Sequence, residues 1–182
     1  MSALSSCGVP VEESETVLPG AGTVSSSVAS PVTTTGPDTG GVSVGAVVYF
    51  IRDEGLVGRA RVISSGPESP EDLLRLLVSG PVESETDSGV RSGLTNRPDL
   101  VLGTQVDDES VIIDLAATFA DLPGGEQLLV LGQITLTVLA NIPVKSVRYL
   151  LGGVQVAVPD ADGTPRTRPV VRGDYVSLLA RG

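Results

Sequence analysis

Residues 124–153 read GGEQLLVLGQITLTVLANIPVKSVRYLLGG, and this stretch organises the fold of the chain. About seventeen residues follow the opening glycines without a turn signal, which is too long for a typical strand and predicts a helix. The β-branched run ITLTV would suit a strand by propensity alone. Asn141-Ile142-Pro143 predicts a turn, and residues 145–151 alternate like a strand that ends at Gly152–Gly153. We therefore expect a helix joined to a strand by a short turn.

The predicted helix is apolar almost all round, so it should be largely buried. Gln133 and Thr137 are four residues apart, share one face, and need hydrogen-bond partners if they are buried. Polar residues, including Gln127 and Thr135, interrupt the helix, and it is shorter than the roughly twenty apolar residues that a bilayer requires. The helix is therefore predicted to lie in a protein core.

Composition excludes several classes of function. The 182 residues carry a formal net charge of −10, which disfavours nucleic acid as a partner, because phosphate binding relies on Lys and Arg. The chain has no His and one Cys, which excludes Ser–His–Asp catalysis, His-ligated zinc and an intrachain disulfide. With two Phe, three Tyr and no Trp, the core must be aliphatic. We expect no catalytic residues, no cofactor and no metal ligands.

Two hairpins are predicted before the central helix. Residues 44–51 form an apolar strand whose partner spans residues 56–63, and the alternation of that partner places Arg59 and Arg61 on the solvent face. Residues 99–106 and 111–115 form the second hairpin, with an acidic turn between them.

A shorter helix is predicted between the hairpins. It begins with Ser69 as its N-cap and Pro70 in its first turn, and it stops at Gly80-Pro81. The acidic segment Glu83–Asp87 follows it. Alternating acids could bind a divalent cation, but the segment lacks the full ligand pattern of a calcium loop, and a solvated loop is the alternative.

Three carboxylates are the candidates for an enzyme that acts on cell-wall carbohydrate, because two acids suffice for glycoside hydrolysis: Asp107, Asp108 and Asp114. The first two lie in a turn without an aromatic platform, which argues against this reading. Asp114 lies inside an apolar strand, where such a residue more often faces solvent or caps a neighbouring loop.

Basic residues gather near the C-terminus, at Arg166, Arg168 and Arg172. They could form a small anion site, with a solvated face as the alternative. The tripeptide Arg172-Gly173-Asp174 matches a cell-adhesion motif, which we attribute to chance.

The first residues fit the lipobox of a bacterial lipoprotein, with an aliphatic residue and two small residues before the cysteine, at Leu4-Ser5-Ser6-Cys7. Cys7 would carry a diacylglyceryl thioether and anchor the protein to a membrane. A signal peptide also needs a basic segment and an apolar run, and only six residues precede Cys7. We therefore interpret residues 1–7 as the remnant of a signal peptide whose true start lies about fifteen residues upstream. The alternative is a free thiol on a cytosolic protein.

Residues 8–41 are rich in Ser, Thr, Gly and Pro and show no period of a helix or strand, so we expect a disordered tether. As a flexible coil this tether would span on the order of 30 Å. The folded part is predicted at residues 42–182, with a core at 45–155 and an extension at 156–182.

Residues 45–155 resemble the GerMN domain of sporulation and spore-germination proteins. The resemblance rests on VVYFI (47–51), LLVSGP (76–81), VIIDLAATF (111–119) and above all the stretch 124–153, with Gln133-Ile134, Thr137 and Val144–Val147 in the expected places. The acidic segment at 83–96 is longer than the link usual in the family. Together with the lipobox and the tether, the chain is similar to actinobacterial GerMN lipoproteins.

The resemblance implies an α/β (α+β) fold with a small mixed sheet and two helices packed on one face, preceded by the disordered N-terminal tail. It also implies a non-enzymatic protein anchored to the extracytoplasmic face of the cell membrane. Such a protein would bind an envelope protein or cell-wall material, and a free sheet edge is a ready site for strand addition. The alternatives are a carboxylate-dependent cell-wall hydrolase and a purely structural envelope protein.

Overall fold

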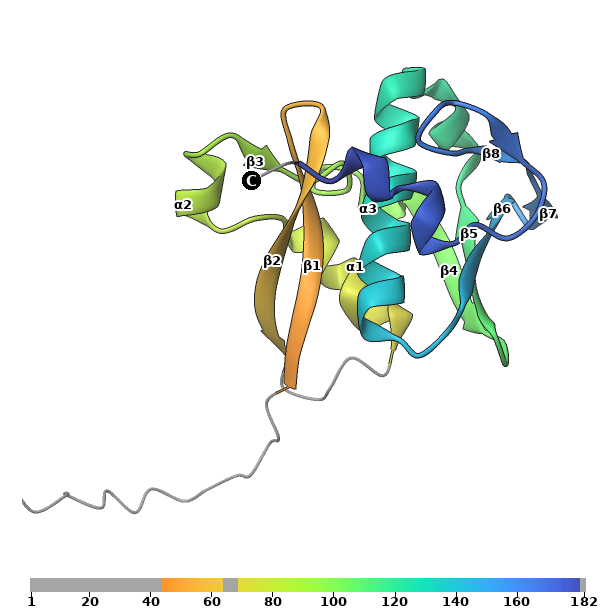
Figure 1. Cartoon of the computed structure of the whole chain (residues 1–182), viewed down its shortest axis with the longest axis horizontal. Coiled ribbons are helices and arrows are strands. Elements are labelled where there is room, and N and C mark those ends of the chain that lie inside the picture. The colour runs from red at the N-terminus through yellow and green to blue at the C-terminus, as the bar shows by residue number, and fades with distance from the viewer. Residues whose placement is uncertain (1–43, 64–68, 181–182) are drawn as a thin grey trace, which may run out of the picture. The chain divides into compact units, whose positions relative to one another are not determined.

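The central helix α3, Gly124–Asn141, forms as predicted and runs between two sheets. The computed structural model describes residues 44–63 and 69–180 (Figure 1). Every residue of α3 from Leu129 to Val138 is buried, because strands lie on both sides of the helix and the C-terminal segment crosses it. The helix ends where Ile142 turns extended, directly before Pro143, which disfavours helical conformation in the residue that precedes it.

The first sheet contains the predicted hairpin of β1 (Val44–Arg52) and β2 (Gly55–Ile63), and β3 (Val90–Arg91) joins it. The strand order is β2-β1-β3, and all pairs are antiparallel. The strand β3 pairs only with Ile51 and Arg52, so most of this edge of β1 has no neighbouring strand.

The second sheet contains β4 (Val101–Val106), β5 (Ser110–Leu115), β6 (Ser146–Leu151) and β7 (Val154–Gln155), in that order. The strands β4 and β5 form the predicted antiparallel hairpin, and α3 forms the crossover between the parallel strands β5 and β6. The turn from β6 to β7 uses Gly152 and Gly153, whose φ angles of 57° and 82° favour glycine.

Shorter elements complete the domain. The helix α1 (Pro70–Ser79) buries Leu73, Leu74 and Leu77, and α2 (Glu83–Thr86) follows it. The strands β8 (Val158–Pro159) and β9 (Pro165–Arg166) form a third sheet. Short 3₁₀ helices are η1 (Pro98–Leu100), η2 (Ala117–Asp121), η3 (Arg172–Asp174) and η4 (Val176–Leu178).

Two polar side chains of α3 continue the pairing of β1 where β3 ends, and a third bonds to the loop after β3. Thr137 accepts the N–H of Tyr49 at 3.0 Å. The amide of Asn141 accepts the N–H of Val47 at 2.9 Å and donates to its carbonyl at 2.8 Å. Gln133 accepts the N–H of Gly93 at 3.0 Å, in the loop that follows β3. Side chains of the helix thus satisfy the edge of β1 in place of a neighbouring strand.

The α/β class is confirmed, and the strands are divided among three sheets instead of forming one small sheet. The division follows from α3, which occupies the edge of β1 where another strand would pair and separates β1 from β6. The buried Gln133 and Thr137 have the hydrogen-bond partners that their burial requires. None of the helices in the described part of the chain is long and apolar enough to cross a membrane.

Three local predictions differ from the structure. The hydroxyl of Ser69 makes no capping bond to the helix backbone and instead donates to the carboxylate of Glu71. The segment Glu83–Asp87 is largely the helix α2 and not a loop. On β2 the more exposed face carries Gly58, Ala60 and Val62, while Arg59 and Arg61 are half-buried. The cause is Glu85 of α2, which pairs with both arginines. The predicted tether and domain boundary lie outside the described residues.

Candidate functional site

An open cleft lies at the end of the β4–β5 hairpin, beside the turn that follows α3. Its volume is about 630 Å³, and it is lined by Val106, Asp107 and Asp108 on one side and by residues 141–144 on the other. The position of the cleft follows from local sequence, because the acidic turn connects β4 to β5 and Pro143 stops the central helix beside it. The cleft therefore combines two exposed carboxylates with the apolar side chains of Ile142, Pro143 and Val144.

The candidate carboxylates are not brought together. Asp107 accepts the N–H of Asp108 at 2.8 Å, which fixes the tight turn, and neither residue forms an ion pair within the described chain. Asp114 pairs with Gly103 near the other end of the hairpin and accepts the N–H of Gly153 at 2.9 Å. Asp107 faces Ser110, and Asp114 lies four residues further along β5, at a distance of about 13 Å. Asp114 thus caps the β6–β7 turn, as one of the two readings of this residue predicted.

The edge of β4 lies next to the cleft. Asp107 donates its N–H to the carbonyl of Ser110, so these two residues form a hydrogen-bonded pair of the antiparallel ladder. Hydrogen-bonded and non-hydrogen-bonded pairs alternate along such a ladder, and the backbone groups of Thr104 and Val106 therefore point away from β5. No described residue bonds to these groups. The strand VLGTQV contains no charged residue, and the side chains of Leu102 and Val106 are 59 % and 51 % exposed. The cleft and this edge form one continuous surface, which we call the β4 surface (residues 102–108 and 141–144).

In the first sheet, the outer edge of β2 is blocked by side chains and by the C-terminal segment of the same chain. Arg61 donates to the carbonyl of Ala60 at 2.9 Å, and Arg59 donates to that of Gly58 at 3.4 Å. Leu56 pairs with Leu179 of the C-terminal segment, and its carbonyl accepts the N–H of Ala180. Charged side chains and covering segments are the usual means by which proteins block pairing at an edge.

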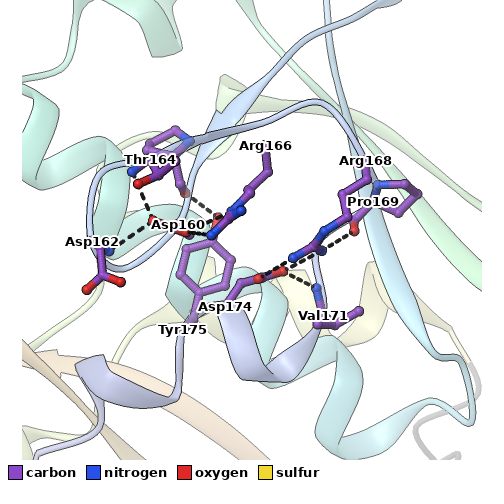
Figure 2. A network of polar contacts seen from close by, with 10 residues as sticks. Asp160, Asp162, Thr164, Arg166, Arg168, Pro169, Val171, Asp174 and Tyr175 are labelled. Atoms are coloured by element: carbon purple, nitrogen blue, oxygen red, sulfur yellow. Dashed lines mark hydrogen bonds and ion pairs between the residues drawn. The ribbon is translucent and has the colours of Figure 1, made fainter.

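Two of the C-terminal arginines pair with aspartates, which argues against an anion site, while Arg168 and Arg172 are exposed to solvent (Figure 2). Arg166 donates to Asp160, whose carboxylate also accepts the N–H groups of Asp162 and Thr164. Burial opposes ionisation of Asp160, but the hydrogen bonds outweigh it and lower the pKa of this carboxyl. The arrangement ties the strand pair β8–β9 together.

The second pair, Arg168 with Asp174, is bidentate at 2.9 and 2.7 Å, and Asp174 also accepts the N–H of Val171. The hydrogen bond from Arg168 lowers the pKa of Asp174. Asp174 is therefore engaged within the domain, which agrees with reading the Arg172-Gly173-Asp174 motif as chance. Arg172 donates to the Tyr49 hydroxyl at 3.2 Å and lies over the Tyr49 ring. Arg172 thus holds the C-terminal segment against β1.

Other acids serve the same structural purpose, and sequence reasoning did not identify them as paired. Glu126 binds Arg91 through two hydrogen bonds of 2.8 Å and lies 3.5 Å from Arg97. The hydrogen bond from Arg91 lowers the pKa of Glu126. A hydrogen bond from Arg61 likewise lowers the pKa of Glu85. The partners are distant in sequence, so no local signal pointed to them.

The predictions about a metal ion and about the anchor at Cys7 concern other parts of the chain. Among the described residues, no group of three or more acidic or cysteine side chains could hold a metal ion. Within the segment Glu83–Asp87, Glu85 is engaged by two arginines. Cys7 lies outside the described residues.

The comparisons with known proteins agree on the fold. The structure is similar to the tandem GerMN domains of the sporulation protein GerM from Bacillus subtilis, with a TM-score of 0.54, 22 % identity, and coverage of 79 % of this chain and 51 % of that one. It is equally similar to the first of those domains, with a TM-score of 0.54, 18 % identity and coverage of 71 % and 98 %. The chain thus spans about half of the tandem protein and nearly all of one domain.

No curated protein matches the chain. A family model described as "Germane: Sporulation and spore germination" matches residues 47–157, which is more than half of the sequence. This range includes most of the first hairpin, all of the second, α1 and α3, and it ends in the link between β7 and β8. The chain therefore belongs to the Germane (GerMN) family.

Proposed function

We propose that this protein is a lipid-anchored GerMN module of the cell envelope, which binds another envelope protein without transforming it. The family model supports the relation to sporulation and germination proteins, but a fold shared at this level of identity does not identify a partner. The function must therefore be argued from the chain's own surface.

The observation that carries the proposal is the β4 surface. It exposes an uncharged strand edge with unbonded backbone groups among the described residues, next to an open cleft. The acids that lie against other elements, at Glu85, Glu126, Asp160 and Asp174, all pair with arginines that hold those elements together. A surface of backbone edge, apolar side chains and unpaired acids suits recognition of a polypeptide.

The anchor part of the proposal rests on Cys7, which follows the lipobox-like residues Leu4-Ser5-Ser6. A diacylglyceryl group at Cys7 would hold the protein at the extracytoplasmic face of the membrane. The Ser/Thr/Gly/Pro-rich residues 8–41 would then act as the tether that lets the domain reach a partner.

Two arms of one experiment test the proposal in the native host, with the complete gene. In the first, Cys7→Ser is expected to move the protein from the membrane fraction to the soluble fraction, and unchanged membrane association would contradict the anchor. In the second, a photo-crosslinking residue is placed at exposed Leu102, Val62 or Val176 in the membrane-bound protein. A discrete protein adduct from at least one position is expected, and the lack of an adduct from all three would contradict an interaction module.

A further inference from the structure

We infer that the edge of β4 binds an extended, basic polypeptide segment of the partner by strand addition, with a Lys or Arg side chain placed beside Asp107 and Asp108. The inference rests on the proposed function and adds to it the site, the binding mode and the chemistry of the partner. Three features of the β4 surface lead to it.

The first feature is the direction of the backbone groups. Thr104 and Val106 aim their N–H and C=O groups outward, in the spacing that an added strand requires. Residues Gly103–Val106 pair regularly with β5, because the irregularity of this hairpin lies between Val101 and Gly103. An added strand would therefore find a regular template over the half of β4 that leads to the cleft.

The second feature is the contrast between the edges of β2 and β4, the long edge strands of the first two sheets. On β2, arginine side chains occupy the outward carbonyls of Gly58 and Ala60, and the C-terminal segment covers Leu56. On β4, the Thr104 hydroxyl donates a hydrogen bond to the carboxylate of Glu71. The backbone N–H and C=O of Thr104 have no hydrogen-bond partner on the outer side among the described residues. Among the described residues, the domain thus occupies the outward backbone groups of β2 and leaves those of Thr104 and Val106 on β4 without a partner, although α1 packs against β4.

The third feature is charge. Asp107 and Asp108 are exposed and have no ion-pair partner within the described chain, while neighbouring Glu109 pairs with Lys145. An added strand would extend past Val106 into the cleft, where Ile142, Pro143 and Val144 can pack against the aliphatic stem of Lys or Arg. A basic side chain at this position would complement the two acids, and an acidic one would be repelled.

The same charges disfavour a second copy of the chain. Antiparallel pairing of two β4 strands would bring Asp107 and Asp108 of one copy toward Asp99 of the other, because Asp99 lies just before the strand. Each copy also carries a net charge of −10. We therefore assign the edge to a basic segment of a different polypeptide.

The test uses the full chain and synthetic peptides of alternating Val and Thr, blocked at both ends, with Lys or Glu at the N-terminal position. The N-terminus of an antiparallel added strand lies beside the acidic turn. Binding is measured by titration calorimetry at low and at moderate salt. We expect saturable binding of the Lys peptide, and binding of the Glu peptide at least about tenfold weaker.

Matched variants locate the binding site. Thr104→Pro removes the outward N–H and is expected to abolish binding, whereas Thr104→Val removes only the hydroxyl and should bind like the wild type. Asp108→Lys, in an exposed turn, leaves one acid beside one base and should therefore abolish the preference for the Lys peptide over the Glu peptide. Urea unfolding checks that each variant is folded. Asp108→Lys keeps the test decisive if Thr104→Pro does not fold.

Several results would overturn the inference. One is equal binding of the two peptides by the wild type, and another is undiminished binding by folded Thr104→Pro. A concentration-dependent dimer that Thr104→Pro abolishes would assign the edge to a second copy instead. No peptide binding, together with a cellular crosslink from Val62 or Val176 but not from Leu102, would overturn this inference and leave the proposed interaction module standing.

Discussion

Asn141 satisfies the backbone of a strand with the side chain of a helix. Its amide both accepts from and donates to Val47, and it also donates to the carbonyl of Thr137 at 2.6 Å. One primary amide thus replaces the residue of a neighbouring strand and joins the end of α3 to β1. Because β1 has no other partner at Val47 on this side within the described chain, the contact fixes how the helix and the hairpin meet.

Asn141→Ala is expected to lower the free energy of unfolding by about 1–3 kcal/mol, because it leaves both backbone groups of Val47 without their partner. The measurement is urea unfolding, in which the midpoint should fall with little change in the slope. The matched control is Asn96→Ala, since Asn96 is exposed and makes no side-chain hydrogen bond to a described residue. Equal stability of the two variants would contradict the role given to Asn141.

At the scale of elements, the loop after β3 reaches α3 only because residue 93 is glycine. A Cβ atom at Gly93 would lie 2.5 Å from Cγ2 of Val130, a fully buried and β-branched residue that cannot move aside easily. The close approach lets Gln133 bond to the N–H of Gly93 and to the hydroxyl of Ser92, both at 3.0 Å.

Gly93→Ala is therefore expected to destabilise the protein by about 1–3 kcal/mol through overpacking. The control is Gly103→Ala, where no atom lies within 4 Å of the added methyl group. Thermal unfolding followed by circular dichroism compares the two, and only Gly93→Ala should lower the midpoint. A wild-type midpoint for Gly93→Ala would show that the loop does not need this close contact.

The sequence was sufficient to predict the elements whose apolar pattern is local: α3, α1 and both hairpins. It was also sufficient to expect partners for Gln133 and Thr137. It did not predict how the strands divide among sheets, because Asn141 and Val47 are 94 positions apart and no periodicity records their contact. The helix α2 was missed for the same reason, since its role is to place Glu85 against arginines of β2.

The candidate site was predictable only in part. The exposed turn of Asp107 and Asp108 was read correctly from its composition, and the binding edge beside it was not identified. Whether a strand lies at the edge of a sheet depends on the strand order, which is a property of the whole chain. The difference between the two edges depends in turn on side chains from α2 and the C-terminal segment.

At the scale of the whole molecule, ion pairs join elements that are distant in sequence, so stability should depend on acid pH. The pKa values of Glu126, Glu85 and Asp174 are lowered in the folded protein by hydrogen bonds from arginines. As pH falls, such groups are protonated first in the unfolded chain. Their contribution is complete above the ordinary carboxyl pKa values of 4.5 and 3.8 and is lost as pH falls through the lower, folded values.

We therefore expect a free energy of unfolding that is nearly constant between about pH 6 and 7.5, since the chain has no His, and that falls steeply below about pH 4.5. Urea titrations at a series of pH values measure this profile without adding salt. In Glu126→Gln, the drop in the free energy of unfolding between neutral and acid pH should be smaller than in the wild type by about 1 kcal/mol. This figure allows for solvent screening of the partly exposed Arg91. Asp108→Asn, which breaks no ion pair among the described residues, should leave the profile unchanged. A wild-type profile that stays flat to pH 3, or an equal acid loss in Glu126→Gln, would show that these pairs do not couple the elements as the contacts imply.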